Sequence, residues 1–300
     1  MSKSKAWISA MRLRTLPLSI SGILVGSMTA KIDGHWNLWV FISALTTTLL
    51  FQILSNLAND FGDSKKGTDN ENRLGPTRAV QSGLISLNEM KFAVILTAIL
   101  SLISAATLIY LSSKNWNFTT VLFYTFLAMA CVLAAITYTV GRRAYGYHGL
   151  GDVFVFLFFG VVSVLGVYPL YANQLNLQTI FAACSIGFFS TAVLNLNNMR
   201  DQINDAIMNK RTLVVKLGEE KAKMYHAFLI LGGLVCWLIF ITSLNKPFLY
   251  ISFLPTILFV KHLVQVFKTT ESKQLDAQLK PVALSTFFMS LLFSIGAFLS

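Results

Sequence analysis

Residues 37–63 read NLWVFISALTTTLLFQILSNLANDFGD, and this stretch combines the two features that decide the fold. Its first part, residues 37–59, is predominantly apolar and as long as a helix that crosses a bilayer, which takes about 20 residues. It ends in Asn59-Asp60-Phe-Gly-Asp63, so carboxylates follow directly after the apolar run. The pattern predicts a transmembrane helix with an acidic cluster at one end.

Working outward from this stretch, eight further segments are long and apolar enough to cross a membrane. The nine predicted spans are residues 12–31, 37–59, 91–112, 117–140, 152–171, 178–200, 223–243, 247–267 and 281–299. Their apolar residues run continuously instead of alternating, which argues against a β-barrel. Helices also pair every backbone group internally, as lipid requires. We therefore expect an all-α integral membrane protein of about nine transmembrane helices, with residues 1–300 forming a single domain.

The composition agrees with a membrane protein and excludes an ordinary soluble one. Hydrophobic residues make up 55% of the chain and charged residues only 12%, against roughly 25% charged residues in soluble domains. The three cysteines lie inside apolar runs and follow no disulfide or metal-binding spacing. The apolar stretch that starts at Leu16 has no clear cleavage site, so we interpret it as a retained first helix and not as a signal peptide.

The net charge of +11 is distributed unevenly between the two sides of the membrane. With nine spans, 21 of the 24 Lys and Arg residues fall on the side of the N-terminus, leaving Lys31, Lys114 and Lys246 on the other. Because basic loops stay in the cytoplasm, this split predicts a cytoplasmic N-terminus and gives no reason to expect a nucleic acid partner. All acidic residues except Asp33 share that side. This pattern suits a site for a charged ligand with an apolar tail.

Two clusters of oxygen donors end two of the predicted helices on this side. Asn56, Asp60 and Asp63 are spaced i, i+4 and i+7, so a helix places them on one face. A second cluster, at the end of residues 178–200, has the spacing i, i+4 and i+8 and consists of Asn197, Asp201 and Asp205. Carboxylates stacked on one face repel each other, and a divalent cation relieves that repulsion. Such donors suit Mg²⁺, which favours carboxylates together with phosphate oxygens.

Basic and aromatic residues surround the two clusters along the chain. Lys and Arg side chains that bind phosphate follow each cluster: Lys65, Lys66, Arg73 and Arg78 after the first, Lys210 and Arg211 after the second, and Arg142 after the fourth span. Residues 138–152, YTVGRRAYGYHGLGD, are rich in Gly and Tyr. These tyrosines suit a membrane interface, and they also suit a pocket that binds an aromatic ring or shields a carbocation.

These residues resemble the UbiA superfamily of membrane prenyltransferases, and more narrowly its 1,4-dihydroxy-2-naphthoate prenyltransferase branch. The resemblance covers most of the chain. The paired Asp motifs are specific for the superfamily, whereas Gly75-Pro76-Thr-Arg78 and Tyr145-Gly-Tyr147-His-Gly-Leu-Gly-Asp152 point to the naphthoate branch. The broad family often has a further Asp where this chain has Gly67, with Asp69 two residues on. The metal contact of Asp69 therefore stays open.

The resemblance implies a UbiA-type helical bundle with a cytoplasmic cap, in the plasma (inner) membrane of a bacterium, with the active site on the cytoplasmic face. It implies that Mg²⁺ binds polyprenyl diphosphate, which ionises to an allylic cation. The ring of 1,4-dihydroxy-2-naphthoate attacks this cation and loses its carboxylate as CO₂, giving a demethylmenaquinone, while apolar helices shelter the tail within the lipid bilayer. The resemblance also implies three sets of site residues. Catalysis falls to Asp60, Asp63, Asp201 and Asp205, and metal binding to the same four residues together with Asn56 and Asn197. The diphosphate would be bound by Arg14, Lys65, Arg78, Arg142 and Lys210, and the acceptor by Tyr138, Tyr145, Tyr147 and Asp152.

Three other functions stay open at this point. The same chemistry serves other acceptors, such as 4-hydroxybenzoate, homogentisate or haem, and helix count and Asp spacing do not separate them. A membrane transporter is a different class of protein, but transporters place ionisable groups near the bilayer midplane, and here they gather at one face. The third is a non-catalytic scaffold that binds lipid.

Overall fold

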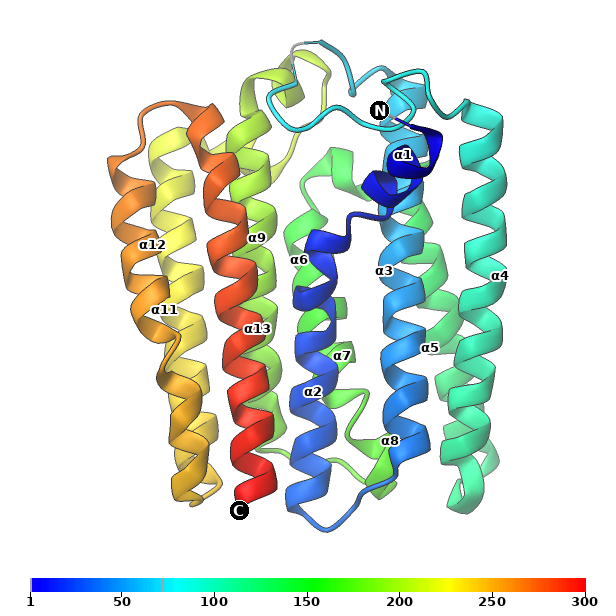
Figure 1. Cartoon of the computed structure of the whole chain (residues 1–300), viewed down its shortest axis with the longest axis vertical. Helices are drawn as coiled ribbons and strands as arrows, with labels where there is room; N and C mark the ends of the chain where they lie inside the picture. The colour runs from blue at the N-terminus through cyan, green and yellow to red at the C-terminus, as the bar shows by residue number, and fades with distance from the viewer. Residues whose placement is uncertain (1, 72) are drawn as a thin grey trace.

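A computed structural model of the chain describes residues 2–71 and 73–300. The long helices run side by side along one axis, and the chain ends lie at opposite ends of the bundle (Figure 1). No strand occurs in the part of the chain that the structure describes. The α-helices are α1 Lys3–Met11, α2 Leu16–Ile32, α3 Leu38–Lys66, α4 Leu87–Ser112, α5 Phe118–Thr137, α6 Gly151–Val155, α7 Ser163–Leu165, α8 Pro169–Ala172, α9 Thr179–Ile207, α10 Leu213–Leu217, α11 Glu219–Ser243, α12 Thr256–Lys268 and α13 Asp276–Leu299.

The predicted membrane architecture is confirmed. Within residues 2–71 and 73–300, eight helical segments are long and apolar enough to cross a bilayer, and a ninth forms if α1 and α2, bent by 40° at residues 12–15, count as one span. Helix α2 packs against α3 on one side and α13 on the other, and α9 packs against α11 and α13. The result is a multi-pass helical membrane protein whose exposed apolar side chains cover the outside of the bundle.

The predicted span limits were wrong at several ends. Helix α3 continues to residue 66 instead of 59, and α9 to residue 207 instead of 200. The helices that begin at residues 87, 219 and 276 also start earlier than predicted. Backbone hydrogen bonds continue through polar side chains, so a helix does not stop where its apolar run stops. The acidic clusters therefore lie within the last turns of α3 and α9 and not after them.

Two predicted spans are not continuous α-helices. The span at residues 152–171 contains a π-helical stretch, Phe156–Val162, between α6 and α7. The span at residues 247–267 opens with a 3₁₀ stretch, Pro247–Phe253, and α12 begins only after Pro255. Proline supplies no backbone N–H, so it favours such breaks. At Gly160 a Cβ atom would lie 2.4 Å from the Ala183 carbonyl oxygen, which shows how closely the π-helical stretch approaches α9.

Candidate functional site

The end of α3 carries Asp60 and Asp63 in its last two turns, and Gly67 ends the helix in a left-handed conformation (φ +73°). Carboxylates near a helix C-terminus oppose the helix dipole, at a cost of about 0.3–1 kcal/mol each. The end of α9 carries Asp201 and Asp205 in the same unfavourable position. All four residues are 5% exposed or less. Four buried carboxylates at helix C-termini require cations close by.

Side chains from two loops supply those cations and join the two helix ends. The Lys210 Nζ lies 3.7 Å from Asp63 Oδ2 on α3 and 3.7 Å from Asp205 Oδ1 on α9. The Arg73 Nε lies 3.6 Å from Asp201 Oδ2 and 3.3 Å from Asp69 Oδ1. The two acidic helix ends therefore meet at one end of the bundle, under the loops drawn at the top of Figure 1.

The pKa values of the loop residues reflect this crowding of charge. Burial alone would lower the pKa of Lys210, but the carboxylates of Asp63 and Asp205 outweigh it and raise that pKa above its ordinary value. Burial, and then the neighbouring Arg78, lower the pKa of Arg73 to about 10. Burial raises the pKa of Asp69, although Arg78 opposes the shift. Lys210 is thus held as an ammonium ion between the two helices.

Arg200 is the most deeply buried cation of the site, with its side chain fully enclosed. Its guanidinium donates to both oxygens of Asp201, at 3.0 and 2.6 Å, and to Asp276 at the start of α13. It also donates to Asn197 Oδ1 at 2.8 Å. A Cβ atom on Gly75 would lie 2.6 Å from Arg200 Nη2, so the loop before α4 packs directly on this guanidinium. Arg200 therefore fixes Asp201 and supports the loop above it.

The loop of residues 67–86 covers the site and is tied to both helices. The backbone N–H of Ala79 donates to Asp60 Oδ2 at 3.2 Å. Asn204 on α9 donates to the Thr68 carbonyl at 3.0 Å. Asp69 is buried between Arg73 and Arg78. These contacts make the loop a lid over the carboxylates.

The Gly- and Tyr-rich segment after α5 forms the third side of the site. The Tyr147 hydroxyl donates to Asp63 Oδ1 at 2.7 Å, and its ring lies 3.8 Å from Lys66 Nζ. The Tyr138 ring packs edge-on against Tyr145, 5.3 Å between centroids. Tyr145 instead donates its hydroxyl to the Ala134 carbonyl and stacks on Phe154. Of the three tyrosines, Tyr147 contacts the charged cluster directly.

Asp152 lies at the start of α6 and is buried beside this segment. Its Oδ1 atom has no hydrogen-bond partner in the described structure. A buried carboxylate oxygen without a partner is costly, so a polar group of a ligand would stabilise it. The Tyr138 ring packs next to this residue, since a Cβ atom on the neighbouring Gly151 would lie 3.3 Å from a carbon of that ring.

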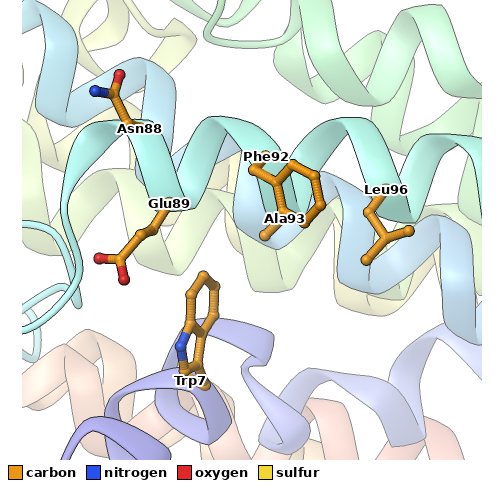
Figure 2. Close-up of a pocket in the computed structure, with 6 residues that line it drawn as sticks. All are labelled: Trp7, Asn88, Glu89, Phe92, Ala93 and Leu96. Carbon is orange, nitrogen blue, oxygen red and sulfur yellow. The ribbon is translucent and has the colours of Figure 1, made fainter.

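Two surface grooves lie away from these residues. One, of about 580 Å³, is lined by Trp7 of α1 and by residues 88–96 of α4. Figure 2 shows Trp7 opposite Glu89 and Phe92 on the side of the bundle. The other, of about 560 Å³, lies at the opposite end, around Asp33 and Tyr168. Neither contains a carboxylate of the α3 or α9 cluster.

Known protein families and sequences include clear relatives of this chain. The sequence pattern of the UbiA prenyltransferase family matches residues 19–292. The chain belongs to the UbiA prenyltransferase family. Over 302 residues it is 41% identical to the 1,4-dihydroxy-2-naphthoate octaprenyltransferase of Escherichia coli K12, covering 100% of this chain and 97% of that protein. The protein of the same name from Haemophilus influenzae is 37% identical over 98% of this chain and 96% of its own length.

A solved structure has the same fold as this UbiA-family chain. It comes from a study of digeranylgeranylglyceryl phosphate synthase in membranes and superposes with a TM-score of 0.61 at 18% identity, with all of both chains covered. At this identity the likeness establishes the helical fold alone. The family membership makes the chain a prenyltransferase, and the expectation of an enzyme is confirmed over that of a transporter or a lipid-binding scaffold.

The two asparagines predicted as metal ligands in this UbiA-family chain form hydrogen bonds with neighbouring groups. Asn56 donates to the Met11 carbonyl at 2.9 Å and accepts from Gln52 at 3.4 Å. Asn197 accepts from Arg200. Within the described residues no three His, Cys, Asp or Glu side chains converge on one point. A metal contact of either asparagine therefore stays a prediction.

Only some of the residues predicted to bind the diphosphate in the UbiA-family site lie within the charged cluster. Lys210 and Arg78 are within the charged cluster. Lys65 and Arg142 are exposed, and neither forms an ion pair in the described part of the structure. The side chain of Arg14 lies outside the described part of the structure. The roles of these five residues stay predictions.

Several residues of the UbiA-family site were absent from the predicted sets, and some left a signal in the sequence. Lys66 follows Asp63 by three positions and so shares its helix face, whereas Lys65 does not. With its amide oriented to satisfy both neighbours, Asn59 donates to Asp63 at 2.9 Å and accepts from Arg12 at 3.3 Å. Arg200 directly precedes Asp201, but nothing in the sequence indicates its second partner, Asp276, 76 positions away.

Proposed function

We propose that this prenyltransferase moves a polyprenyl group from polyprenyl diphosphate to 1,4-dihydroxy-2-naphthoate, with Mg²⁺ as cofactor and loss of the acceptor carboxylate as CO₂. The observation that carries the proposal is the meeting of the acidic ends of α3 and α9 over an apolar helical bundle. The names of the similar proteins from E. coli and H. influenzae support the choice of acceptor.

The donor atoms at the two helix ends fit Mg²⁺. They are carboxylate oxygens, and Asn204 Oδ1 beside them is buried without a hydrogen-bond partner in the described structure. Asp60 with Asp63, and Asp201 with Asp205, would each hold one ion, with water and phosphate oxygens as the remaining ligands. When bound, Mg²⁺ offsets the charge that develops on a departing diphosphate.

The chain's own cations would hold the diphosphate. Lys210 and Arg73 already bridge the carboxylates, and Lys66 and Arg78 lie next to them. Arg binds phosphate oxygens in a bidentate manner and Lys as a point charge. When the C–O bond breaks, its electron pair leaves with the diphosphate, and these cations stabilise that charge in a site from which the covering loop excludes water.

The acceptor would lie between the charged cluster and Asp152, along the Tyr138 ring. The free Asp152 Oδ1 would accept a hydrogen bond from a ring hydroxyl. A ring face next to the diphosphate also attracts the positive charge of an allylic cation. Attack by the acceptor ring forms the new C–C bond, and release of CO₂ leaves the quinol form of a demethylmenaquinone.

The membrane orientation follows from the charge distribution. The end of α3, which carries Lys65, and the loops that carry Arg73 and Lys210 are at the same end of the bundle as the N-terminus (Figure 1). By the positive-inside rule we place this end, and with it the active site, on the cytoplasmic face of the bacterial inner membrane. The diphosphate head would then be taken from the cytoplasm, with the apolar tail among the helices. We also treat residues 1–300 as one domain.

Product analysis tests the proposed function. Purified full-length protein is incubated with Mg²⁺, a polyprenyl diphosphate and either 1,4-dihydroxy-2-naphthoate, 4-hydroxybenzoate or homogentisate, and products are identified by mass. We expect a prenylated, decarboxylated product from the naphthoate alone, and none when EDTA replaces Mg²⁺. Transfer to 4-hydroxybenzoate without transfer to the naphthoate would contradict the assigned acceptor.

Asp152→Asn tests the acceptor side of the site. The substitution keeps the volume but replaces the carboxylate that would accept from a ring hydroxyl. Because a hydrogen bond to a charged group contributes about 1.5–3 kcal/mol, we expect the KM for the naphthoate to rise about 10-fold or more. The KM for polyprenyl diphosphate should stay within about twofold. Asp33→Asn, at the far end of the bundle, is the control and should leave both constants unchanged; a rise in the donor KM alone would reject the assignment.

A further inference from the structure

Tyr147 makes more contacts with the charged groups of the site than a residue of an acceptor pocket needs. Its hydroxyl lies 2.7 Å from Asp63 Oδ1 and 2.6 Å from Thr68 Oγ1. Its ring centroid is 3.8 Å from Lys66 Nζ and 5.5 Å from Lys210 Nζ. One side chain therefore contacts a carboxylate of α3, the covering loop and two ammonium groups.

The backbone around Tyr147 is tied to the segment that carries Lys210. The Arg211 N–H donates to the Tyr147 carbonyl at 3.0 Å, and Lys216 Nζ donates to the His148 carbonyl at 2.8 Å. A Cβ atom on Gly149 would lie 3.0 Å from the Arg211 carbonyl oxygen, so the two segments are in close contact. Tyr147 is thus held from the α9 side while its hydroxyl reaches α3.

Each contact of Tyr147 has a physical effect on the groups it touches. A hydroxyl that donates to Asp63 fixes the direction of that carboxylate. The face of an aromatic ring attracts an ammonium ion, and more strongly where water is excluded. Lys66 Nζ lies over the Tyr147 ring and Lys210 Nζ lies near it, so the ring stabilises two ammonium groups that would otherwise repel each other. Two neighbouring ammonium groups would bind a diphosphate more strongly than one.

Tyr145 provides an internal comparison. It belongs to the same short helical turn, Tyr145–His148, but its hydroxyl donates to the Ala134 carbonyl of α5. Its ring stacks on Phe154 with 3.9 Å between centroids, and no ammonium group lies over it in the described structure. The two tyrosines thus differ by two positions in sequence but face different surroundings.

We propose that Tyr147 is a positioning residue for the diphosphate of the donor, which it serves by orienting Asp63 and by keeping Lys66 and Lys210 side by side. This inference rests on the proposed function. It separates Tyr147 from Tyr138 and Asp152, which face the acceptor. The family resemblance implies a contact of Tyr147 with the acceptor, and this inference gives Tyr147 a role toward the donor in its place.

The test compares Tyr147→Phe with the matched variant Tyr145→Phe in the full-length, detergent-solubilised protein. Each substitution removes one hydroxyl and keeps the ring. We expect Tyr147→Phe to raise the KM for polyprenyl diphosphate about 10-fold, since a hydrogen bond to a charged group is lost. The KM for the naphthoate should stay within about twofold. Tyr145→Phe, whose hydroxyl donates to the Ala134 carbonyl and not to the charged cluster, should leave the KM for polyprenyl diphosphate at its wild-type value. Tyr147→Leu, which also removes the ring, should raise the donor KM further than Tyr147→Phe.

A second readout does not depend on turnover. Mg²⁺ with inorganic diphosphate should raise the midpoint of thermal unfolding of the wild type and of Tyr145→Phe, and should raise that of Tyr147→Phe clearly less. The inference is wrong if Tyr147→Phe is stabilised like the wild type, or if only its acceptor KM rises. If the wild type does not prenylate the naphthoate at all, the proposed acceptor fails, while the diphosphate shift still decides the role of Tyr147.

Discussion

Asp60→Asn and Asp201→Asn should each lower the rate of prenyl transfer by at least about 100-fold, while the protein stays folded in the membrane. Both residues are buried at helix ends that meet through shared cations. The amide keeps the shape of the side chain but removes the charge that would hold Mg²⁺ and the diphosphate. Losses of about 100- to 1000-fold are typical when one group that stabilises developing charge is removed.

The measurement is the initial rate of product formation at saturating substrates, with the thermal unfolding midpoint as a check on folding. Glu220→Gln, an exposed carboxylate in the first turn of α11, serves as the control and should retain full activity. A rate near that of the wild type in either aspartate variant would remove the basis for the metal role of the cluster.

Arg200→Met should destabilise the protein by about 3–5 kcal/mol, the usual cost of removing one partner of a buried ion pair. The guanidinium is enclosed and binds Asp201, Asp276 and Asn197 at once. Met fills a similar volume but leaves the Asp201 carboxylate without its main partner. The covering loop also loses its support, because Gly75 packs directly on Arg200.

This prediction is checked by thermal unfolding in detergent, monitored by the loss of the helical circular dichroism signal. The exposed Arg143→Met is the control and should shift the midpoint by little, since surface charges contribute about 0–1 kcal/mol. An unchanged midpoint in Arg200→Met would show that the buried network does not stabilise the fold.

The membrane architecture was predictable because its signal is local. A bilayer imposes a minimum length on each apolar helix, so nine apolar runs indicated the spans directly. The ends of α3 and α9 were predicted seven residues too early, since polarity and helix formation are separate properties. The π-helical stretch at Phe156–Val162 was not predictable from the apolar pattern, because it depends on how closely Gly160 approaches α9.

The acidic clusters were predictable from spacing along one helix face, but their partners were not. Helical periodicity brings Asp60 and Asp63 together. It says nothing of Lys210, which reaches both helices from the loop after α9. The predicted set contained Lys65 and not Lys66, although the spacing from Asp63 favours Lys66, which lies over the Tyr147 ring. Contacts made by loops depend on tertiary packing that one sequence does not reveal.

The ion pair between Arg200 and Asp276 has a consequence for biosynthesis. As the chain leaves the ribosome, α9 enters the bilayer well before α13, so Arg200 meets the carboxylate 76 positions later only when the last helix inserts. Until then the Arg200 guanidinium is paired with Asp201 but lacks its second carboxylate, Asp276. A nascent chain that ends after α12 would therefore contain all four carboxylates of the α3 and α9 ends and still lack the Asp276 partner of Arg200.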